Sequence, residues 1–308
     1  MNPLVSVICI SYNHAPYIKE ALNSVFNQVH TEIEVIILDD GSSDKSREEI
    51  QKYIEEKSEV VFIPNTKNEG YTRTFNKGLA LAKGKYVVDF ALDDVMLPNF
   101  LSESVKRLEI LGEEYGVSFS NADYINSECK VIGNHNKTLF DKKLIQEIPQ
   151  GDIFEMVLKR YFICTPAMVI RKSVFDRMGG YDEGLSYEDF DFWLRSSRHY
   201  KYTFIDEVLM QKRKLKSSMS MARYKHRENE HMLSVLAVCR KAFSLCKSKS
   251  ELDSLYERLS YEHRQCIRYQ VFDLADQYIV LVKNIGRSVL KLQLVGLLIR
   301  LGFDKGRV

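Results

Sequence analysis

The chain has 308 residues, of which 45% are hydrophobic, and 44 Lys and Arg stand against 42 Asp and Glu. This length fits one large domain or two ordinary ones, and the apolar content excludes an intrinsically disordered chain. With only 15 Gly and 6 Pro, collagen-like and low-complexity classes are excluded as well.

The first part of the chain alternates between short apolar runs rich in β-branched residues and segments with helical spacing of apolar residues. The expected strands are 4–10, 35–38, 60–63, 86–92 and 117–120. The expected helices are 17–27, 43–56, 72–82 and 98–111. This alternation predicts an α/β fold with a mostly parallel central sheet flanked by helices.

Polar side chains follow three of these strands, at the edge of a parallel sheet where ligands bind. They are Ser11, Tyr12, Asn13 and His14 after the first strand, Asp39 and Asp40 after the second, and Asp93 and Asp94 after the fourth. Four neighbouring carboxylates repel one another unless a cation binds them, and a hard divalent ion carrying a diphosphate would resolve this. The alternative is that Asp39, Asp40 and Asp93 are helix N-caps.

Several nucleotide-binding classes lack their sequence signature. No GxGxxG follows the first strand and no GxxxxGK[ST] is present, so neither a dinucleotide-binding domain nor a P-loop is expected. A nucleotidyltransferase on a similar sheet stays an alternative, although the loop at 11–14 lacks the glycines and basic residues that would hold a triphosphate. Nucleic-acid binding is not expected, because no aromatic platform interleaves the basic residues.

The charge is distributed unevenly along the chain. Residues 1–210 hold 24 basic and 33 acidic residues, whereas 211–308 hold 20 and 9. We therefore expect a boundary near residue 210, followed by a basic α-helical C-terminal region. Its basic residues indicate either attachment to an anionic surface or a solvated helical face.

Cysteine usage and hydropathy indicate the compartment. The six cysteines form no CxxC pair and no zinc-finger spacing, which is typical of a reducing environment. The run at 4–10 is too short for a signal peptide, and no stretch of 18 apolar residues predicts a spanning helix. We expect a cytoplasmic protein.

A series of motifs in fixed order resembles the family 2 glycosyltransferases. The motifs stand at 5–13 (VSVICISYN), 21–28, 34–44 (EVIILDDGSSD), 68–70, 76–80, 82–86, 92–98 (LDDVMLP), 179–183 (GGYDE) and 187–195 (YEDFDFWLR). The resemblance covers about 4–210 and implies a GT-A catalytic domain over 1–210, with a nucleotide-sugar half at 1–97 and an acceptor half at 98–210. It implies a nucleotide-diphosphate sugar donor, with a UDP-sugar favoured, and a divalent metal cofactor, Mn²⁺ or Mg²⁺.

The resemblance also implies the donor site. Tyr12 would lie against the base and Asp39 would hydrogen-bond it, and the nucleotide-binding set is Ser11, Tyr12, Asn13, Asp39, Asp40, Asn68, Arg73 and Leu92. Asp93 matches the metal-binding end of the DxD motif. Asp94 is either a second ligand or the cap of the following helix. Ala91 stands where the motif has its first Asp, and this favours the alternative of a non-catalytic interaction protein.

On the acceptor side, the pair Glu188 and Asp189 matches the family's acidic motif. Asp189 would be the general base of an inverting displacement, because a hydroxyl must lose its proton as it attacks the anomeric carbon. Glu188 and Asp191 are the fallback bases. Without the resemblance, these carboxylates would be the exposed start of a helix.

Tyr181, Asp182 and Trp193 complete the acceptor side that the resemblance implies. Trp193 lies four residues after Asp189, and therefore on the same helical face, where it would stack on a sugar ring or anchor the core. The turn at 179–180 would present Tyr181 and Asp182 to the acceptor, or these two would be structural. His14 is interpreted as a loop histidine without a role.

The C-terminal region predicts helices over 223–283 and an amphipathic segment over 289–303 flanked by basic residues. This segment would lie on an anionic membrane surface or dock on protein. If the segment lies on a membrane, it leads us to expect peripheral contact with the inner face of the membrane. The resemblance implies a glycan or lipid-linked acceptor and a role in polysaccharide, capsule or lipopolysaccharide biosynthesis. Which sugar and acceptor are used depends on loops such as 124–150.

Overall fold

The computed structural model describes residues 2–215 and 230–300, and the expectations for 216–229 and 301–308 lie outside them. The chain forms two compact units. Within the described residues, unit 1 comprises 2–153, 162–183 and 199–215, and unit 2 comprises 154–161, 184–198 and 230–300. The division differs from a single boundary near 210, because the segments 154–161 and 184–198 cluster with the C-terminal helices and not with the sheet.

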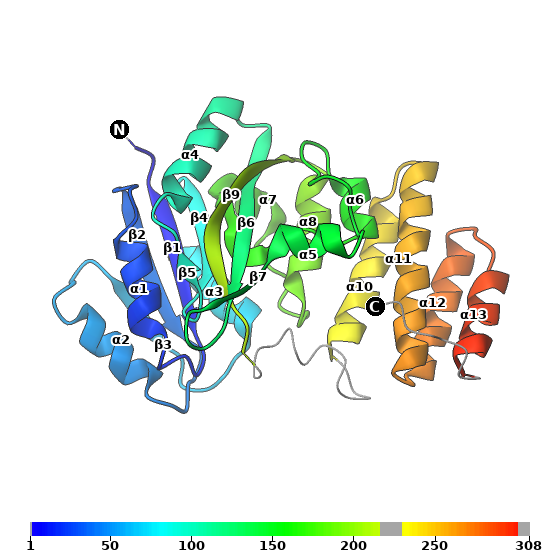
Figure 1. Cartoon of the computed structure of the whole chain (residues 1–308), viewed down its shortest axis with the longest axis horizontal. Coiled ribbons are helices and arrows are strands. Elements are labelled where there is room, and N and C mark those ends of the chain that lie inside the picture. The colour runs from blue at the N-terminus through cyan, green and yellow to red at the C-terminus, as the bar shows by residue number, and fades with distance from the viewer. Residues whose placement is uncertain (1, 216–229, 301–308) are drawn as a thin grey trace. The chain divides into compact units, whose positions relative to one another are not determined.

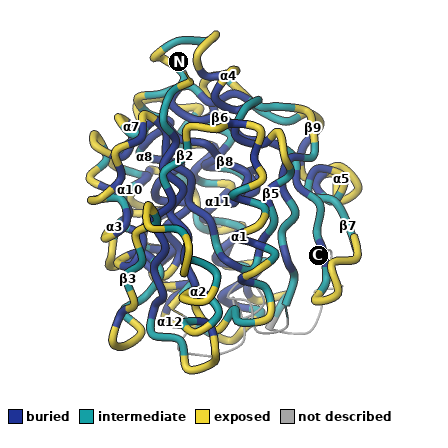
Figure 2. The backbone as a smooth tube through the Cα atoms, turned by 90° about the vertical axis from the view of Figure 1, so that its left-hand side faces the viewer, coloured by how far each residue is buried: buried dark blue, intermediate teal, exposed yellow. Residues whose placement is uncertain are grey.

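The first half of unit 1 is a parallel sheet in the order β3-β2-β1-β4 (Figure 1). Its strands are β1 (Val5–Ser11), β2 (Ile33–Asp39), β3 (Val61–Pro64) and β4 (Tyr86–Ala91), and its helices are α1 (Ile18–Phe26), α2 (Ser46–Ile54) and α3 (Tyr71–Leu81). Every residue of β1 is buried, which explains its continuous apolar sequence. Figure 2 shows buried stretches in dark blue and exposed loops, such as the one beside β3, in yellow. The elements expected here from the sequence are confirmed.

The second half of unit 1 is mixed. Strands β8 (Met168–Arg171) and β6 (Tyr115–Ile125) continue the sheet in antiparallel pairing, and β9 (Lys201–Arg213) then runs parallel to β6. The other elements are β5 (Val95–Met96), α4 (Phe100–Leu111), β7 (Val131–Asn134), α5 (His135–Asp141), the 3₁₀ turn η1 (Thr165–Ala167) and α7 (Lys172–Met178). The α/β fold class is confirmed, with parallel pairing confined to β1–β4 and to β6–β9.

Arg171 ties the two halves of the sheet together. It lies at the end of β8 with a buried side chain, and its guanidinium donates to the carbonyls of Tyr115 (2.8 Å), Leu108 (2.7 Å) and Gly112 (3.1 Å) and to the Tyr86 hydroxyl (3.0 Å). These bonds join β8, β6, the end of α4 and β4. A buried cation is tolerated here because its donors are satisfied.

Unit 2 is helical, as the sequence predicts for its C-terminal part. Its elements are α6 (Phe154–Lys159), α8 (Glu188–Ser197), α10 (Glu230–Leu245), α11 (Lys249–Arg268), α12 (Phe272–Asn284) and α13 (Leu290–Arg300). Helix α11 packs against α6, α12 and α13, and it begins with a capping box formed by Ser248 and Glu251. Across 2–215 and 230–300, no helix combines the length and apolar character needed to cross a bilayer.

Candidate functional site

The loop after β1 is held by the loop after β2. Asn13 has a φ of 57°, and its side-chain oxygen accepts the backbone N–H groups of Ser43 (2.9 Å) and Asp44 (3.3 Å). The backbone N–H of Asn13 donates to the Ser42 hydroxyl (2.9 Å), and that of His14 donates to the Ser46 hydroxyl at the start of α2 (2.9 Å). The strand ends Ser11 and Asp39 are also register partners in the sheet. The loop after β1 is therefore fixed before any ligand binds.

Asp39 closes the loop after β2. Its buried carboxylate accepts the Ser42 backbone N–H (3.0 Å), the Ser42 hydroxyl (2.5 Å) and Arg47 Nε (2.8 Å). The N-cap position of α2 belongs to Lys45, so Asp39 is not a helix cap. Arg47, which the sequence analysis did not single out, neutralises the carboxylate and would have to adjust for Asp39 to accept a hydrogen bond from a base.

Asp40 supports the segment that follows β3. Its oxygens accept the Thr74 hydroxyl (2.8 Å), the Asn65 side-chain amide (3.0 Å) and the backbone N–H groups of Glu69 (2.9 Å) and Gly70 (3.1 Å). With these donors and only 3% exposure, the carboxylate is satisfied within the protein. We therefore reassign Asp40 from direct nucleotide contact to positioning.

Gly41 allows the loops after β2 and β3 to meet. Its φ is +76°, and a Cβ at this position would stand 2.3 Å from the backbone nitrogen of Asn68. Only glycine permits this approach. Asn68 is thereby placed at the edge of the sheet, where its side-chain oxygen accepts the Gly70 N–H (3.1 Å).

The carboxylate pair after β4 splits into two roles. Asp94 is buried and accepts the Arg213 backbone N–H (2.7 Å), and α4 begins only at Phe100, so Asp94 does not cap that helix. Burial, followed by the charge of Asp93, raises the pKa of Asp94 to about 8. The Asp93 side chain is 14% exposed, and its Oδ1 lies 3.9 Å from His14 Nε2. Asp93 is thus the carboxylate that remains open to a ligand.

Arg213, at the end of β9, holds this loop in place. Its Nε donates to the Asp93 carbonyl (2.7 Å), its Nη2 pairs with Glu20 (2.6 Å), and the guanidinium stacks on the Tyr17 ring at 4.4 Å. The sequence analysis missed Arg213, because nothing local in the sequence links it to residue 93.

Few of the described residues at this edge of the sheet are suited to binding a metal ion. In the part of the chain that the structure describes, no group of three or more His, Cys, Asp and Glu side chains is arranged to hold a metal. Asp93 and His14 place two side chains of metal-ligating type 3.9 Å apart. The buried Ser11 hydroxyl and His14 Nδ1 have no hydrogen-bond partner among the described residues. Such orphaned polar atoms beside a carboxylate fit a polar or charged ligand.

The remaining donor-side residues differ in exposure. Tyr12 is 45% exposed, and Arg73 is exposed and paired with Glu183 (3.3 Å). Leu92 is fully buried in the core that packs on β1 and β4. Its side chain is therefore a core residue and cannot contact a nucleotide, which corrects the expectation.

Tyr181 is also a core residue. Its ring packs on Phe75 with centroids 4.5 Å apart, and its hydroxyl donates to Asp89 Oδ2 (3.0 Å). Tyr71 donates to the other oxygen of Asp89 (2.6 Å). This buried cluster assigns Tyr181 to structure and not to acceptor contact. Asp182 is half-buried in unit 1.

In unit 2, helix α8 begins with Glu188 and Asp189, and both side chains are mostly buried. Their place in the first turn favours the charged forms, because the positive end of the helix dipole lies there. Asp191 is buried between Arg195 (2.6 Å) and Lys241 (2.7 Å), so it is a structural ion-pair residue and not a base.

Trp193 anchors α8 in unit 2. It is 2% exposed and packs near Tyr161, with ring centroids 6.2 Å apart. Its burial excludes stacking on a sugar, so of the two roles expected from the sequence the structure supports that of a core anchor.

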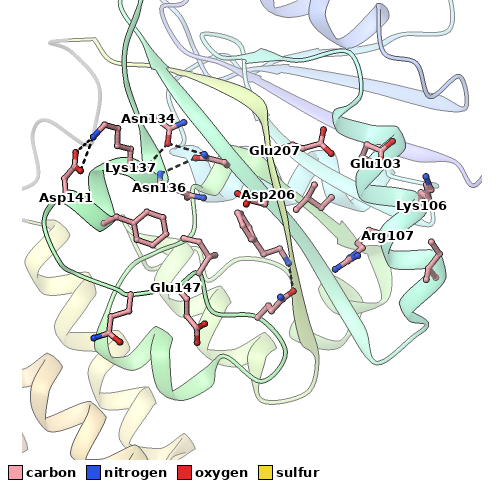
Figure 3. Close-up of a pocket in the computed structure, with 18 residues that line it drawn as sticks. Glu103, Lys106, Arg107, Asn134, Asn136, Lys137, Asp141, Glu147, Asp206 and Glu207 are labelled. Carbon is pink, nitrogen blue, oxygen red and sulfur yellow. Dashed lines mark hydrogen bonds and ion pairs between the residues drawn. The ribbon is translucent and has the colours of Figure 1, made fainter.

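A groove of about 1100 Å³ lies in unit 1 among α4, α5 and β9. Figure 3 shows Lys106 and Arg107 on one side, Lys137 and Asp141 on the other, and Asp206 on β9 between them. None of the site residues predicted from sequence lines this groove. Part of its wall comes from the loop 124–150, which the sequence indicated as specificity-determining.

Comparison with known protein families supports the assignment of this edge of the sheet as a functional site. The family described as Glycosyl transferase family 2 matches residues 6–179. A glycosyltransferase of Methanocaldococcus jannaschii that is named as uncharacterized is 28% identical over 215 residues, which cover 68% of this chain and 71% of that protein. A Bacillus subtilis glycosyltransferase, TuaG, named for teichuronic acid biosynthesis, is 39% identical over 124 residues, or 40% of this chain and 47% of that one.

Solved structures share the fold. S. aureus TarS (1–349) in complex with UDP-GlcNAc has a TM-score of 0.68 at 17% identity, covering 97% of this chain and 92% of that one. A mannosyltransferase from Pyrobaculum calidifontis in complex with GDP-Man and Mn²⁺ has a TM-score of 0.65 at 16% identity, covering 99% and 82%. These matches confirm the GT-A fold. Together with the family match, they favour a transferase over the nucleotidyltransferase and the non-catalytic protein that the sequence left open.

Proposed function

Because the chain belongs to glycosyl transferase family 2 and is therefore a glycosyltransferase, we propose that it moves a sugar from a UDP-sugar to a hydroxyl of a glycan or lipid-linked acceptor. The observation that supports this most is the convergence of Tyr12, Asp39 and Asp93 at the carboxyl edge of β1, β2 and β4. The exposed Tyr12 ring offers a stacking surface for the base, and Asp39 would accept a hydrogen bond from the ring N–H of the base once Arg47 has moved aside.

Asp93 would hold the divalent ion, Mn²⁺ or Mg²⁺, with the diphosphate of the donor. The ion, when bound, would neutralise the charge that the leaving diphosphate gains. Asn13 and Asn68, fixed at the same edge, would orient the nucleotide by their side-chain amides. Arg73 is the nearby cation that we assign to the donor side, where it would leave Glu183 to meet the phosphates.

Asp189 would take the proton of the acceptor hydroxyl as its oxygen attacks the anomeric carbon. The bond from that carbon to the diphosphate oxygen breaks on the opposite side, so the product has inverted configuration. Glu188 would add a second negative charge beside Asp189, which favours transfer of the proton to Asp189.

The donor proposal is tested by thermal unfolding with UDP, UDP-sugars and GDP-sugars, with and without Mn²⁺. A ligand at one hundred times its Kd adds about 2.7 kcal/mol, which raises the Tm by several degrees. We expect the uridine compounds to raise the Tm and Asp93→Asn to remove the Mn²⁺-dependent part. Asp176→Asn, on the surface of α7, is the matched control. A shift with GDP-sugars alone would overturn the choice of UDP, and no shift with any nucleotide would overturn the donor site.

We assign the groove of unit 1 to the growing end of the acceptor glycan. Its wall combines amides, carboxylates, both signs of charge and the exposed Phe140 ring, which suits a neutral polyhydroxylated chain. Its volume exceeds the roughly 300–1,000 Å³ of a small-molecule site. Along β9, Glu207 stands six residues, or about 20 Å, before Arg213, so the groove would meet sugars several units from the reacting one.

Acceptors of increasing length test this assignment. Phe140→Ala should raise the KM of long acceptors about tenfold, since the lost ring contact is worth about 1.4 kcal/mol, and leave short acceptors unchanged. Val131→Ala, an exposed apolar residue on β7, is the control. An equal loss for short and long acceptors, or no loss, would contradict the groove while leaving the donor site intact.

The pathway and the membrane contact complete the proposal. The name of TuaG and the basic C-terminal region support polysaccharide, capsule or lipopolysaccharide biosynthesis at the inner face of the membrane. In unit 2, helix α13 buries Leu292 but exposes Leu290, Leu294, Leu297 and Leu298. A helix that is apolar on its buried and its exposed face suits an apolar environment on both.

A further inference from the structure

His14 is positioned more tightly than a loop histidine needs to be. Its backbone N–H donates to Ser46 (2.9 Å), and the next N–H, of Ala15, donates to Asp44 (3.1 Å). Asn13, with its positive φ, turns the chain immediately before it. Strands β1 and β4 pair up to Ile10 and Ala91, so the loops that follow them leave the sheet side by side. The imidazole is thereby placed next to the carboxylate of the neighbouring loop.

Neither ring nitrogen of His14 forms a hydrogen bond to a described residue. Its side chain is 19% exposed, and its Nδ1 is buried without a hydrogen-bond partner among the described residues. Its Nε2 stands 3.9 Å from Asp93 Oδ1, which is too far for a hydrogen bond. The buried atom without a partner is Nδ1, whereas Nε2 is the nitrogen that faces Asp93, so a ligand bound between the two loops would contact Nε2.

We infer that His14 supplies a nitrogen ligand, beside Asp93, to the divalent ion of the donor site, an inference that rests on the proposed function. Two atoms bound to one ion at about 2.1 Å each lie about 3 Å apart when adjacent and about 4.2 Å apart when opposite. The observed 3.9 Å lies between these two values, so a small rotation of either side chain would bring both atoms to one ion. Position 91, two residues before Asp93, holds an alanine and offers no ligand.

An imidazole ligand also sets the choice of metal. Mn²⁺ accepts an imidazole nitrogen more readily than Mg²⁺, which demands near-octahedral oxygen ligands and keeps several waters. A site with one nitrogen and one carboxylate therefore favours Mn²⁺ over Mg²⁺.

Pulsed EPR of the full chain with Mn²⁺ and UDP tests this without measuring turnover. We expect ¹⁴N modulation from a directly bound imidazole in the wild type, its loss in His14→Gln, and at least about tenfold weaker Mn²⁺ binding in that variant. His14→Asp, which returns an oxygen ligand, should regain Mn²⁺ binding without the ¹⁴N signal and bind Mg²⁺ better relative to Mn²⁺. His30→Gln is the control, because His30 contacts the Pro3 carbonyl (2.8 Å) at the opposite end of β1.

Three results would overturn the inference. If wild-type protein binds Mn²⁺ with UDP but shows no ¹⁴N modulation, His14 is not a ligand, and the donor site stands without it. If the modulation persists in His14→Gln, another histidine is the ligand. If no Mn²⁺ binds with UDP at all, both this inference and the metal part of the proposed function fail.

Discussion

Asp189→Asn is expected to lower kcat by about 10²–10⁴-fold, the usual contribution of a general base, and to leave the Kd for the nucleotide-sugar unchanged. Asn has nearly the shape of Asp, so the first turn of α8 keeps its packing. What is lost is the ability to accept the proton of the attacking hydroxyl. The acidic limb of the pH–rate profile, which reports protonation of the base, should disappear together with the activity.

Neighbouring carboxylates in the same helix provide the comparison. Glu188→Gln removes a charge one residue away and should reduce kcat by about tenfold or less, because it alters the field around the base and not the base itself. Asp191→Asn should act on stability, since it breaks a buried ion pair with Arg195 and Lys241. If Asp189→Asn keeps most of the wild-type kcat with unchanged melting, the base lies elsewhere.

The parallel half of the sheet was predictable because its signals are local. Strands β1, β2 and β4 are continuous apolar runs, and the motifs after them end at strand termini that the register then brings together. The antiparallel half was predicted poorly. Strands β5 and β8 have two and four residues, too few to show a period, and β9 carries charged residues along its length.

A second limit of prediction from the sequence is that a motif does not give the direction of a side chain. A motif places Leu92 beside Asp93, the carboxylate proposed to bind the metal, but the Leu92 side chain is buried in the core and only Asp93 is partly exposed. For Tyr181 and Trp193 the sequence leaves acceptor contact and a structural role open, and their burial favours the structural role. The sequence does not predict the contacts of Arg213 and Arg47. Arg213 contacts Asp93, 120 residues earlier in the chain, and the contact of Arg47 with Asp39 depends on the path of the loop between them.

His14 illustrates a further limit of interpretation from the sequence. The sequence offers no requirement for a histidine in this chemistry, so it was interpreted as a loop residue without a role. Asp93 stands 79 residues after His14 in the chain, and the two side chains come close only because β1 pairs with β4. Sites assembled from loops of adjacent parallel strands are therefore recognisable by motif at each loop, but their ligand sets become visible only in three dimensions.

The membrane contact predicts the second large effect. Leu290, Leu294 and Leu297 are more than half exposed and share one side of α13, with 75%, 59% and 54% of their surface open. Lys291, Arg160 and Arg264 line a pocket of about 200 Å³ in the same unit. Leucines flanked by cations suit an interface rich in anionic lipid, where the leucines enter the acyl boundary and the cations meet the headgroups.

Flotation with phosphatidylglycerol vesicles measures this contact. Wild-type protein should bind them and bind phosphatidylcholine vesicles weakly. Leu294→Ser with Leu297→Ser should reduce binding more than about 100-fold, since each buried leucine contributes about 1.5–3 kcal/mol. Val131→Ser with Ile132→Ser removes two exposed apolar residues from β7 in unit 1 and should have no effect.

The dependence of vesicle binding on salt, and of dimerisation on protein concentration, distinguishes a membrane contact from a contact with a second copy of the chain. Binding through the cations of α11 and α13 must weaken as salt screens them, and Lys291→Gln should reduce it by severalfold, because each basic residue near an anionic surface contributes about 1 kcal/mol. If the leucines of α13 instead join two copies of the chain, the protein will dimerise as its concentration rises and the double Leu→Ser variant will stay monomeric. Vesicle binding would then be weak and independent of lipid charge, and the proposed membrane contact would be wrong.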